Sequence, residues 1–492
     1  MEFKDTTLAE VDTSARLSEK AFQLYKTVSS QQRAFFLRSI AEEIESLGNE
    51  LVETAMSETN LPEARILGER GRTTGQCRMF ANLIEEGSWV EARIDTAIPD
   101  RLPVPKPDLR KMLHPLGPVV VFGAANFPLA YSTAGGDTIS ALAAGCSVIV
   151  KAHPAHTVTS TLIAKAIEKA RLKAEMPANI FIHLYGAGFE VGKALVEHSC
   201  IKAVGFTGSY AGGKALFDLA NKRPVPIPVF AEMSSINPVI LLPETLSRDA
   251  DSWAQKLSAS MTLNVGQFCT SPGLIIGIQN DPLNRFIDSL TKSINTVLPG
   301  TMLHEGITAH YSKKLMQVLK QPTVMKLSER EQNPISNHGT AVVASVSAAE
   351  FLKNSILEEE VFGPFALIVK CSDKIEMIQV IRHLQGQLTS TVIGDTEELN
   401  QNKDILDLIS EKAGRLIING LPTGVEVCPA MNHGGPFPAS TDSRFTAVGS
   451  DAIKRFVRPV AFQNFPESLL PFELHDRNPL NILRLVNNEW KR

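Results

Sequence analysis

The sequence has 492 residues, of which 43% are hydrophobic and 21% charged, and its net charge is −4. A chain of this length exceeds one ordinary hydrophobic core and predicts two or three domains of a globular protein. The small negative charge gives no reason to expect nucleic acid or an anionic membrane as a partner.

The N-terminus and the cysteines indicate a cytoplasmic protein. The first residues, Met1–Thr6, include acidic side chains and lack an apolar core, unlike a secretory signal. The six cysteines are scattered along the chain, as is typical of reduced thiols rather than of a disulfide framework. No apolar run is long enough to span a membrane. The sequence contains neither a CxxC nor an HExxH motif, so no protein-bound metal is expected.

The hydrophobic pattern changes after Pro118. Residues 12–90 show apolar side chains at helical spacing, whereas the following segment alternates short apolar strands with helices. Such alternation predicts an α/β protein with a parallel, doubly wound sheet of the dinucleotide-binding type. The expected strands are 119–124, 147–150, 180–184 and 203–207, and the expected helices are 137–145, 157–174, 190–198 and 211–221.

A second α/β domain is expected beyond Asn237, reaching to about Gly435. The tail 457–492 is rich in Pro and Asn, and we expect it to pack on a partner subunit. The expected strands of the second domain are 239–242, 274–276, 341–343, 367–369 and 416–418, and its expected helices are 252–263, 283–297, 311–319, 375–384 and 397–412.

Two residues suggest covalent chemistry. Cys269 lies in a short turn between a helix-like run and an apolar strand, where a thiol can be both held and reached. Glu232 ends the strand-like stretch 228–231, and a carboxylate near a thiol can serve as a general base. Each residue alone also has a purely structural interpretation, because a free cysteine is usually a small buried hydrophobe and a glutamate is usually salt-bridged.

Several strand ends are suited to a nucleotide. The turn Gly208–Gly213 and the residue Lys151 follow expected strands, and glycine turns before helices favour phosphate. A lysine in this place is more often simply solvated, unless the neighbouring turns also bind a nucleotide. The turn Gly186–Gly192 has one residue too many for the GxGxxG fingerprint, so a tight turn without a ligand is an equal alternative. Asn126 follows the strand 119–124 and can donate to an oxyanion, or can simply form a turn before Phe127-Pro128.

Together these motifs resemble the aldehyde dehydrogenase superfamily over essentially the whole chain. Segments 230–238, 420–428 and 433–436 are most similar to the branch of α-ketoglutaric semialdehyde (2,5-dioxopentanoate) dehydrogenases, which also contains NADP-using bacterial fatty aldehyde dehydrogenases. The matching segments, in chain order, are Asn126-Phe127-Pro128-Leu129, Lys151, Phe206-Thr207-Gly208-Ser209, Glu232, Gly266-Gln267-Phe268-Cys269-Thr270, Glu360-x-Phe362-Gly363-Pro364 and Asn419-Gly420.

The resemblance implies a three-part α/β fold and an oligomer. A Rossmann-type cofactor-binding domain would comprise residues 1–87 and 119–237, and an α/β catalytic domain residues 238–435. A small oligomerisation arm with the C-terminal segment would comprise residues 88–118 and 436–492. The assembly would be a homodimer or homotetramer.

The resemblance also assigns roles. Cys269 would attack the aldehyde, Asn126 and the Cys269 N–H would stabilise the oxyanion, and Glu232 would activate water to hydrolyse a cysteine thioester. Lys151 and Glu360 would hold the adenosine and nicotinamide riboses. Thr207, Gly208 and Ser209 would lie at the cofactor phosphates, and Phe362 near the nicotinamide.

The cofactor is expected to be NADP or NAD, with NADP slightly favoured. Relatives that prefer NAD commonly carry Glu three residues after the lysine, whereas this chain has Pro154 there, so no carboxylate repels a 2′-phosphate. For the substrate we expect Phe127 to lie nearby, and Gln267 and Arg444 are candidate partners of a substrate carboxylate.

The predicted reaction is NAD(P)-dependent oxidation of an aldehyde to an acid, with 2,5-dioxopentanoate to 2-oxoglutarate as the leading case. A fatty or broad-range aldehyde dehydrogenase is the alternative. The presence of Glu232 argues against the CoA-acylating branch, which lacks this base. A cysteine hydrolase would need a histidine, and no local motif pairs any of the 11 histidines with Cys269. A non-catalytic homologue would be expected to have lost Cys269, Glu232 or Asn126.

Overall fold

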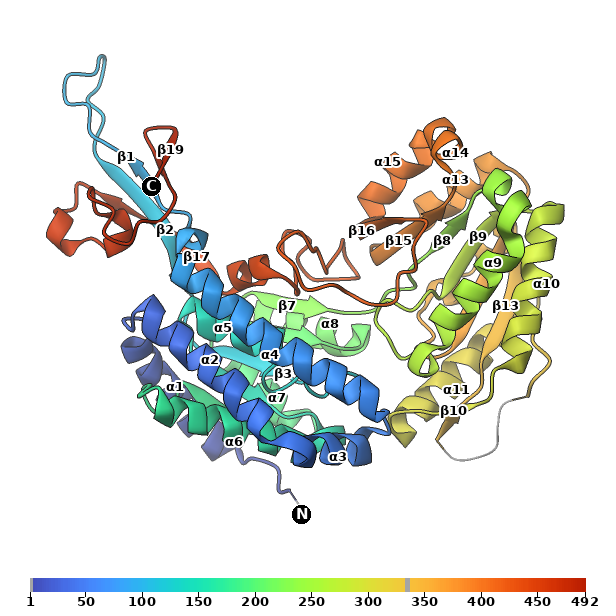
Figure 1. The fold of residues 1–492 in the computed structure, drawn as a ribbon, viewed down its shortest axis with the longest axis horizontal. Coiled ribbons are helices and arrows are strands. Elements are labelled where there is room, and N and C mark those ends of the chain that lie inside the picture. The colour runs from blue at the N-terminus through green and yellow to red at the C-terminus, as the bar shows by residue number, and fades with distance from the viewer. Residues whose placement is uncertain (1–2, 332–336) are drawn as a thin grey trace.

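The computed structural model describes residues 3–331 and 337–492 and contains two α/β layers and a projecting arm (Figure 1). Four helices precede the first sheet. The first of them begins with a capping box, in which Thr7 and Glu10 each accept a hydrogen bond from the other's backbone N–H. These helices are α1 (Leu8–Tyr25), α2 (Ser30–Ser46), α3 (Gly48–Thr59) and α4 (Glu63–Glu86).

The first sheet is parallel and has the strand order β5-β4-β3-β6-β7. From β3 the chain adds β4 and β5 on one side and then β6 and β7 on the other, so the direction of strand addition reverses at β3. The carboxyl ends of β4 and β6 therefore flank the kind of crevice where such sheets bind ligands. The elements of this layer are β3 (Val119–Phe122), α5 (Gly136–Ala144), β4 (Val148–Lys151), η2 (Pro154–His156), α6 (Thr157–Lys173), β5 (Phe181–Leu184), α7 (Glu190–Glu197), β6 (Ala203–Thr207), α8 (Tyr210–Asn221) and β7 (Val229–Glu232).

The second sheet has seven strands in the order β11-β13-β14-β9-β8-β15-β16, all parallel except β11. Apolar cores lie on both of its faces, because alternate side chains of strands such as β9 point to opposite sides. The elements of this part are β8 (Val239–Leu241), α9 (Pro243–Thr262), η3 (Leu263–Gly266), β9 (Leu274–Ile278), α10 (Asp281–Thr296), β10 (Gly300–Thr301), α11 (Glu305–Leu319), β11 (Met325–Lys326), β12 (His338–Gly339), β13 (Val342–Ser347), α12 (Ala348–Phe351), η4 (Ser355–Glu358), β14 (Phe365–Cys371), α13 (Lys374–His383), β15 (Gln387–Ile393), α14 (Thr396–Gln401), α15 (Lys403–Lys412) and β16 (Ala413–Ile418). Strands β10 and β12 pair with each other, in a separate antiparallel ribbon.

A third sheet, in the order β17-β2-β1-β18-β19, forms the arm that projects from the body (Figure 1). It joins segments that are far apart in the sequence, since β17 pairs antiparallel with β2. Its elements are η1 (Ser88–Val90), β1 (Arg93–Asp95), β2 (Leu109–Pro115), β17 (Val457–Gln463), η6 (Glu467–Leu469), η7 (Phe472–Leu474), β18 (Arg484–Val486) and β19 (Glu489–Lys491). The short helix η5 (Ser450–Phe456), which precedes β17, packs in the core beside α5. Within the described ranges, none of the helices combines the length and apolarity that crossing a membrane requires.

The expected strands of the first sheet are all present, and three features differ from the sequence analysis. Strand β15 was not expected, because Gln, Thr and Ser interrupt its apolar pattern, yet all of its residues are buried. The expected helix 397–412 is two helices that meet at Asn402. The tail from Val457, to which sequence analysis assigned no strand, contributes three strands to the arm.

Candidate active site

The turn that carries Cys269 has an unusual backbone. Asn264, Val265 and Gly266 have successive positive φ values of 46°, 57° and 66°. For the β-branched Val265 this conformation costs roughly 1–3 kcal/mol, so the surrounding packing must enforce it. A Cβ atom on Gly266 would overlap the carbonyl group of Gly363, and the turn therefore packs directly on the backbone of the segment that follows Glu360.

The far side of the same turn is held by a buried amide. Asn237 Nδ2 donates to the carbonyl oxygens of Cys269 and Ser271, each at 2.9 Å. Asn237 Oδ1 in turn accepts from the hydroxyls of Ser235 and of Thr389 on β15. Thr389, one of the polar residues that interrupt the apolar pattern of β15, therefore supports the turn of Cys269 through Asn237.

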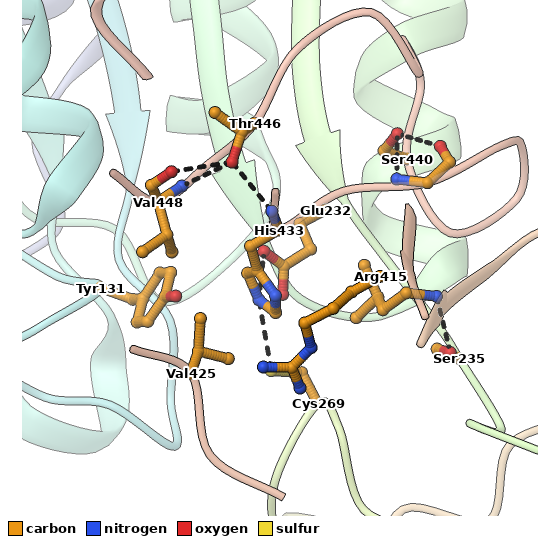
Figure 2. Close-up of polar contacts among 12 residues, drawn as sticks. Tyr131, Glu232, Ser235, Cys269, Arg415, Val425, His433, Ser440, Thr446 and Val448 are labelled. Carbon is orange, nitrogen blue, oxygen red and sulfur yellow. Dashed lines mark hydrogen bonds and ion pairs between the residues drawn. The ribbon is translucent and has the colours of Figure 1, made fainter. Parts of the chain in front are cut away.

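Cys269, Glu232 and His433 meet at one point (Figure 2). The Nε2 atom of His433 lies 3.0 Å from Glu232 Oε2 and 3.6 Å from Cys269 Sγ. The Sγ atom of Cys269, a carboxylate oxygen of Glu232 and a ring nitrogen of His433 all lie within 4.8 Å of one another. Sequence analysis found no histidine partner for Cys269, and the structure supplies one from a segment 164 residues away.

Glu232 is fixed at the carboxyl end of β7. Its backbone pairs with Thr207 of β6 on one side and forms a bridge to Ser440 on the other. Its side chain is 4% exposed, and within the described part of the chain neither carboxylate oxygen has an aligned hydrogen-bond donor. A buried carboxylate with open acceptor positions is suited to accept a proton from a water molecule.

His433 is fixed through its backbone. Its N–H donates to Thr446 Oγ1 at 2.8 Å, and its carbonyl accepts from the N–H of Ala447 at 2.8 Å. The ring is buried and lies 6.3 Å from that of Tyr131. The signal that sequence analysis could have used is the segment His433–Pro436, which it noted as typical of one branch without assigning a role to the histidine.

Burial raises the pKa of the Cys269 thiol well above its ordinary value, and the charge of Glu232 raises it further. The charge of Arg72 lowers the same pKa. The thiol is therefore protonated at neutral pH, and its attack on an electrophile requires a proton acceptor. Glu232 and His433 are the two neighbouring groups able to take that proton.

Asn126 and Gln267 meet beside the turn. Asn126 Nδ2 donates to the carbonyl oxygen of Gln267 at 3.2 Å, which brings the amide close to the cysteine turn. The side chain of Gln267 points elsewhere, since its Oε1 accepts from the N–H of Leu303 and its Nε2 donates to the carbonyl of Asn264. It lines a separate cavity of about 300 Å³. The structure thus assigns the Gln267 amide to support of the turn.

Phe127 belongs to an apolar cluster around the cysteine turn. Its ring lies 5.1 Å from that of Tyr131 and 5.8 Å from that of Phe268, and Val425 packs against the same cluster. Arg65 of α4 stacks over the rings of Phe127 and Phe268. Phe127 therefore lies in the apolar surroundings of the cysteine turn.

Arg444 is placed away from this cluster. Its guanidinium forms two hydrogen bonds to the carboxylate of Asp442, and its side chain is 80% exposed. The charge of Arg444 is therefore already paired at the surface.

The expected nucleotide residues lie at the carboxyl ends of β4 and β6. Lys151 ends β4, where burial lowers the pKa of its ammonium group, and Pro154 begins the short helix η2. Thr207 ends β6, the Gly208 N–H donates to the Glu232 carbonyl, and Ser209 caps α8. Both groups flank β3, the position at which the strand order reverses.

Glu360 and Phe362 approach the cysteine turn from the second sheet. Burial raises the pKa of Glu360 to about 7, although hydrogen bonds from the Ser234 side chain and the Ser235 backbone oppose this shift. Together with Phe268, Glu360 and Phe362 line a small cavity beside the turn. The expected ribose-binding residue is therefore close to the nucleophile.

A family match extends these observations. Residues 1–458 match the model of the aldehyde dehydrogenase family. The chain belongs to this family, and it is an NAD(P)-dependent enzyme that oxidises aldehydes.

Two relatives are similar over almost the whole chain. An alpha-ketoglutaric semialdehyde dehydrogenase of Acinetobacter baylyi is 48% identical, with 99% of this chain and 92% of the relative aligned. An alpha-ketoglutaric semialdehyde dehydrogenase of Azospirillum brasilense is also 48% identical, with 97% and 91% aligned. The resemblance predicted from the motifs is thereby confirmed.

The α/β fold class is confirmed as well. The crystal structure of a glyceraldehyde-3-phosphate dehydrogenase from Methanocaldococcus jannaschii, complexed with NADP, superposes with a TM-score of 0.77. The match covers 94% of this chain and 95% of that chain at 19% identity.

Proposed function

We propose that this enzyme oxidises 2,5-dioxopentanoate to 2-oxoglutarate through a thioester on Cys269. The observation that carries the chemistry is the placement of His433 Nε2 within 3.6 Å of Cys269 Sγ and within 3.0 Å of Glu232. Two relatives that bear the name of this semialdehyde, each 48% identical over nearly the whole chain, support the choice of substrate.

In the first step Cys269 loses its proton to His433 or Glu232 and attacks the aldehyde carbon. The resulting oxyanion accepts hydrogen bonds from the Cys269 backbone N–H and from Asn126 Nδ2. One such donor typically contributes about 3 to 4 kcal/mol to the transition state. The hydrogen bond from Asn126 to the Gln267 carbonyl holds this amide at the edge of the turn.

The residues flanking β3 fit a nicotinamide dinucleotide. Ser209 begins α8, and the N-terminus of that helix favours a pyrophosphate. Lys151 would hold the adenosine ribose and Glu360 the nicotinamide ribose, with Phe362 beside the ring. When bound, the nicotinamide would accept the hydride of the hemithioacetal. Each turnover would consume an aldehyde, oxidised cofactor and water and release an acid, reduced cofactor and a proton.

Glu232 would complete the reaction by accepting a proton from the water that attacks the thioester. Its buried carboxylate, with no aligned donor among the described residues, supports this role. Release of the acid returns the Cys269 thiolate. Replacing Glu232 by Gln should therefore block turnover after the thioester has formed.

A fatty or broad-range aldehyde is the second candidate substrate class. The apolar cluster of Phe127, Tyr131, Phe268 and Val425 around the cysteine turn favours it. A panel of 2,5-dioxopentanoate, pentanal and decanal, followed by NADPH absorbance, separates the candidates. The first proposal predicts the highest kcat/KM for the semialdehyde, and a higher value for decanal would favour the alternative.

Two other classes of protein, a cysteine hydrolase and a non-catalytic homologue, can be distinguished from the proposed dehydrogenase. A cysteine hydrolase would cleave a thioester substrate at full rate without cofactor, and His433 supplies the histidine that such a mechanism needs. A non-catalytic homologue would produce no NADPH and would contain no protected, fast-reacting thiol when titrated with iodoacetamide. The proposed dehydrogenase requires cofactor and shows a single dominant reactive cysteine.

We propose that the first sheet and helices α1–α4 bind the cofactor and that the second sheet carries the catalytic turn. The arm would join subunits into a homodimer or homotetramer, because several of its large apolar side chains are exposed, among them Leu469 at 67% and Trp490 at 64%. Six free cysteines support a cytoplasmic protein. Light scattering of the purified enzyme tests the assembly, and a monomer at micromolar concentration would contradict it.

A further inference from the structure

Two arginines flank the segment that passes in front of Cys269. Arg415 of β16 donates to the carbonyls of Pro422 at 2.6 Å and Gly424 at 3.0 Å. Arg72 of α4 donates to the carbonyl of Val425 at 3.2 Å. The two side chains therefore bind the same stretch of backbone, one from α4 and the other from β16.

Neither guanidinium has an acidic partner among the described residues. In residues 3–331 and 337–492, no carboxylate lies within ion-pair distance of Arg72 or Arg415, and the buried Nε of each has no hydrogen-bond acceptor. Both side chains are only half-exposed. A partly buried cation without an anion is costly, and an anion bound beside it recovers part of that cost.

Both arginines are directed to the neighbourhood of the nucleophile. Arg72 donates a second hydrogen bond, at 3.1 Å, to the hydroxyl of Tyr131, whose ring contacts that of His433. Figure 2 shows Arg415, Tyr131 and Val425 converging on the space beside His433 and Cys269. The charge of Arg72 also lowers the pKa of the Cys269 thiol, in keeping with this proximity.

The position of Arg415 is rigid. A Cβ atom on Gly414 would overlap the carbonyl of Gly434, and Asn432 Nδ2 donates to the Gly414 carbonyl at 2.8 Å. These contacts join β16 directly to the segment that carries His433. The backbone at Arg415 and the backbone at His433 are therefore packed directly against each other.

We infer that Arg72 and Arg415 form an anion subsite that binds the carboxylate at the far end of the substrate while its aldehyde group lies at Cys269. This inference rests on the proposed function, because it names the groups that would recognise a keto-acid semialdehyde. It also replaces Arg444 and Gln267 as the source of that recognition. The ligand class is a short aliphatic acid whose aldehyde and carboxylate stand at opposite ends of the chain.

The subsite explains how a substrate with a carboxylate can bind next to an apolar cluster. Phe127, Tyr131 and Phe268 would exclude water around the carbon chain, and reduced hydration strengthens the interaction of a carboxylate with a guanidinium. Arg rather than Lys suits this place, because the planar fork can bind loop carbonyls and a carboxylate at the same time.

The test compares one charged and one neutral aldehyde of equal length. For Arg415→Met and Arg72→Met, the ratio of kcat/KM for 2,5-dioxopentanoate to that for pentanal should fall about ten- to hundredfold. Damage to the supported segment alone would lower both values together and leave the ratio unchanged. Arg415→Lys should keep part of the ratio, and the surface variant Arg444→Met should keep all of it.

A second measurement does not depend on turnover. Glutarate, which cannot react, should slow the alkylation of Cys269 by iodoacetamide in the wild type, monitored by mass spectrometry of the Cys269 peptide. The same protection should be lost in Arg415→Met and in Arg72→Met.

The outcomes separate the two proposals. If the wild type does not prefer the semialdehyde to pentanal, the proposed substrate is wrong. If the wild type shows that preference but both Met variants keep its ratio and its protection by glutarate, the substrate stands and the anion subsite is overturned. Loss of the ratio only in Arg444→Met would likewise overturn it.

Discussion

The imidazole Nε2 of His433 lies 3.6 Å from the Sγ atom of Cys269, although 164 residues separate them in the sequence. Burial and the charge of Glu232 raise the pKa of the thiol, so the histidine stands where a proton acceptor is needed. The nucleophile of this enzyme is thus placed beside both an imidazole and a carboxylate rather than beside a lone carboxylate.

Replacing His433 by Ala should slow alkylation of Cys269 by iodoacetamide about 10²-fold at neutral pH, because the thiol then loses one of its two proton acceptors. The defect should shrink as the pH rises, since hydroxide can then remove the proton directly. Stopped-flow alkylation from neutral to alkaline pH measures this profile. An identical pH profile for variant and wild type would show that His433 acts only in packing.

Replacing Gly266 by Ala should disrupt the turn of the nucleophile. The new Cβ would overlap the carbonyl of Gly363, at a φ of +66° that side chains rarely adopt. A displacement of about 1 Å at a reacting group can cost about 10² in rate, and we expect a loss of that size in kcat. Gly68→Ala on α4, where the added methyl meets nothing within 4 Å, is the matched control and should retain activity. Equal activity of the two variants would contradict the described packing.

Cofactor binding should weaken as the pH falls through about 7. Burial raises the pKa of Glu360 to about 7, so the carboxylate is ionised above this pH and neutral below it. The ionised form is the stronger acceptor for a ribose hydroxyl. Titration calorimetry with NAD, which lacks the ionisable 2′-phosphate, should show a higher Kd on the acidic side, and Glu360→Gln should abolish the dependence. A dependence that persists in the variant would assign it to another group.

Replacing Pro154 by Glu should reduce kcat/KM for NADP about tenfold while sparing NAD, because a carboxylate three residues after Lys151 would repel a 2′-phosphate. For the wild type we predict that NADP is used at least as well as NAD. A wild-type kcat/KM for NADP tenfold below that for NAD would contradict the prediction that NADP is used at least as well as NAD.

The sequence predicted what depends on local pattern and missed what depends on distant contacts. Strands such as β3 and β6 are short apolar runs, and the turn with Cys269 follows a helix-like segment. Sequence analysis could therefore predict these strands and this turn. Strand β15 was hidden because its Gln387 and Thr389 use their polar groups inside the core, toward Ile236 and Asn237. A polar side chain satisfied by a distant partner gives no local signal.

The same reason explains the site residues that were missed. His433 lies beside the thiol, and Arg415 lies near the histidine because β16 packs against the segment that carries it, through Gly414 and Asn432. Proximity in sequence to a glycine-rich loop made Arg444 a candidate partner of the substrate carboxylate, but the structure shows that Asp442 already pairs its charge.

The most direct test of the covalent mechanism is a single-turnover experiment with Glu232→Gln, saturating NADP and 2,5-dioxopentanoate. The mechanism predicts a burst of one NADPH per active site, followed by almost no turnover, with the acyl group found on the Cys269 peptide by mass spectrometry. Steady turnover at the wild-type rate, or a burst without acylation of Cys269, would contradict it.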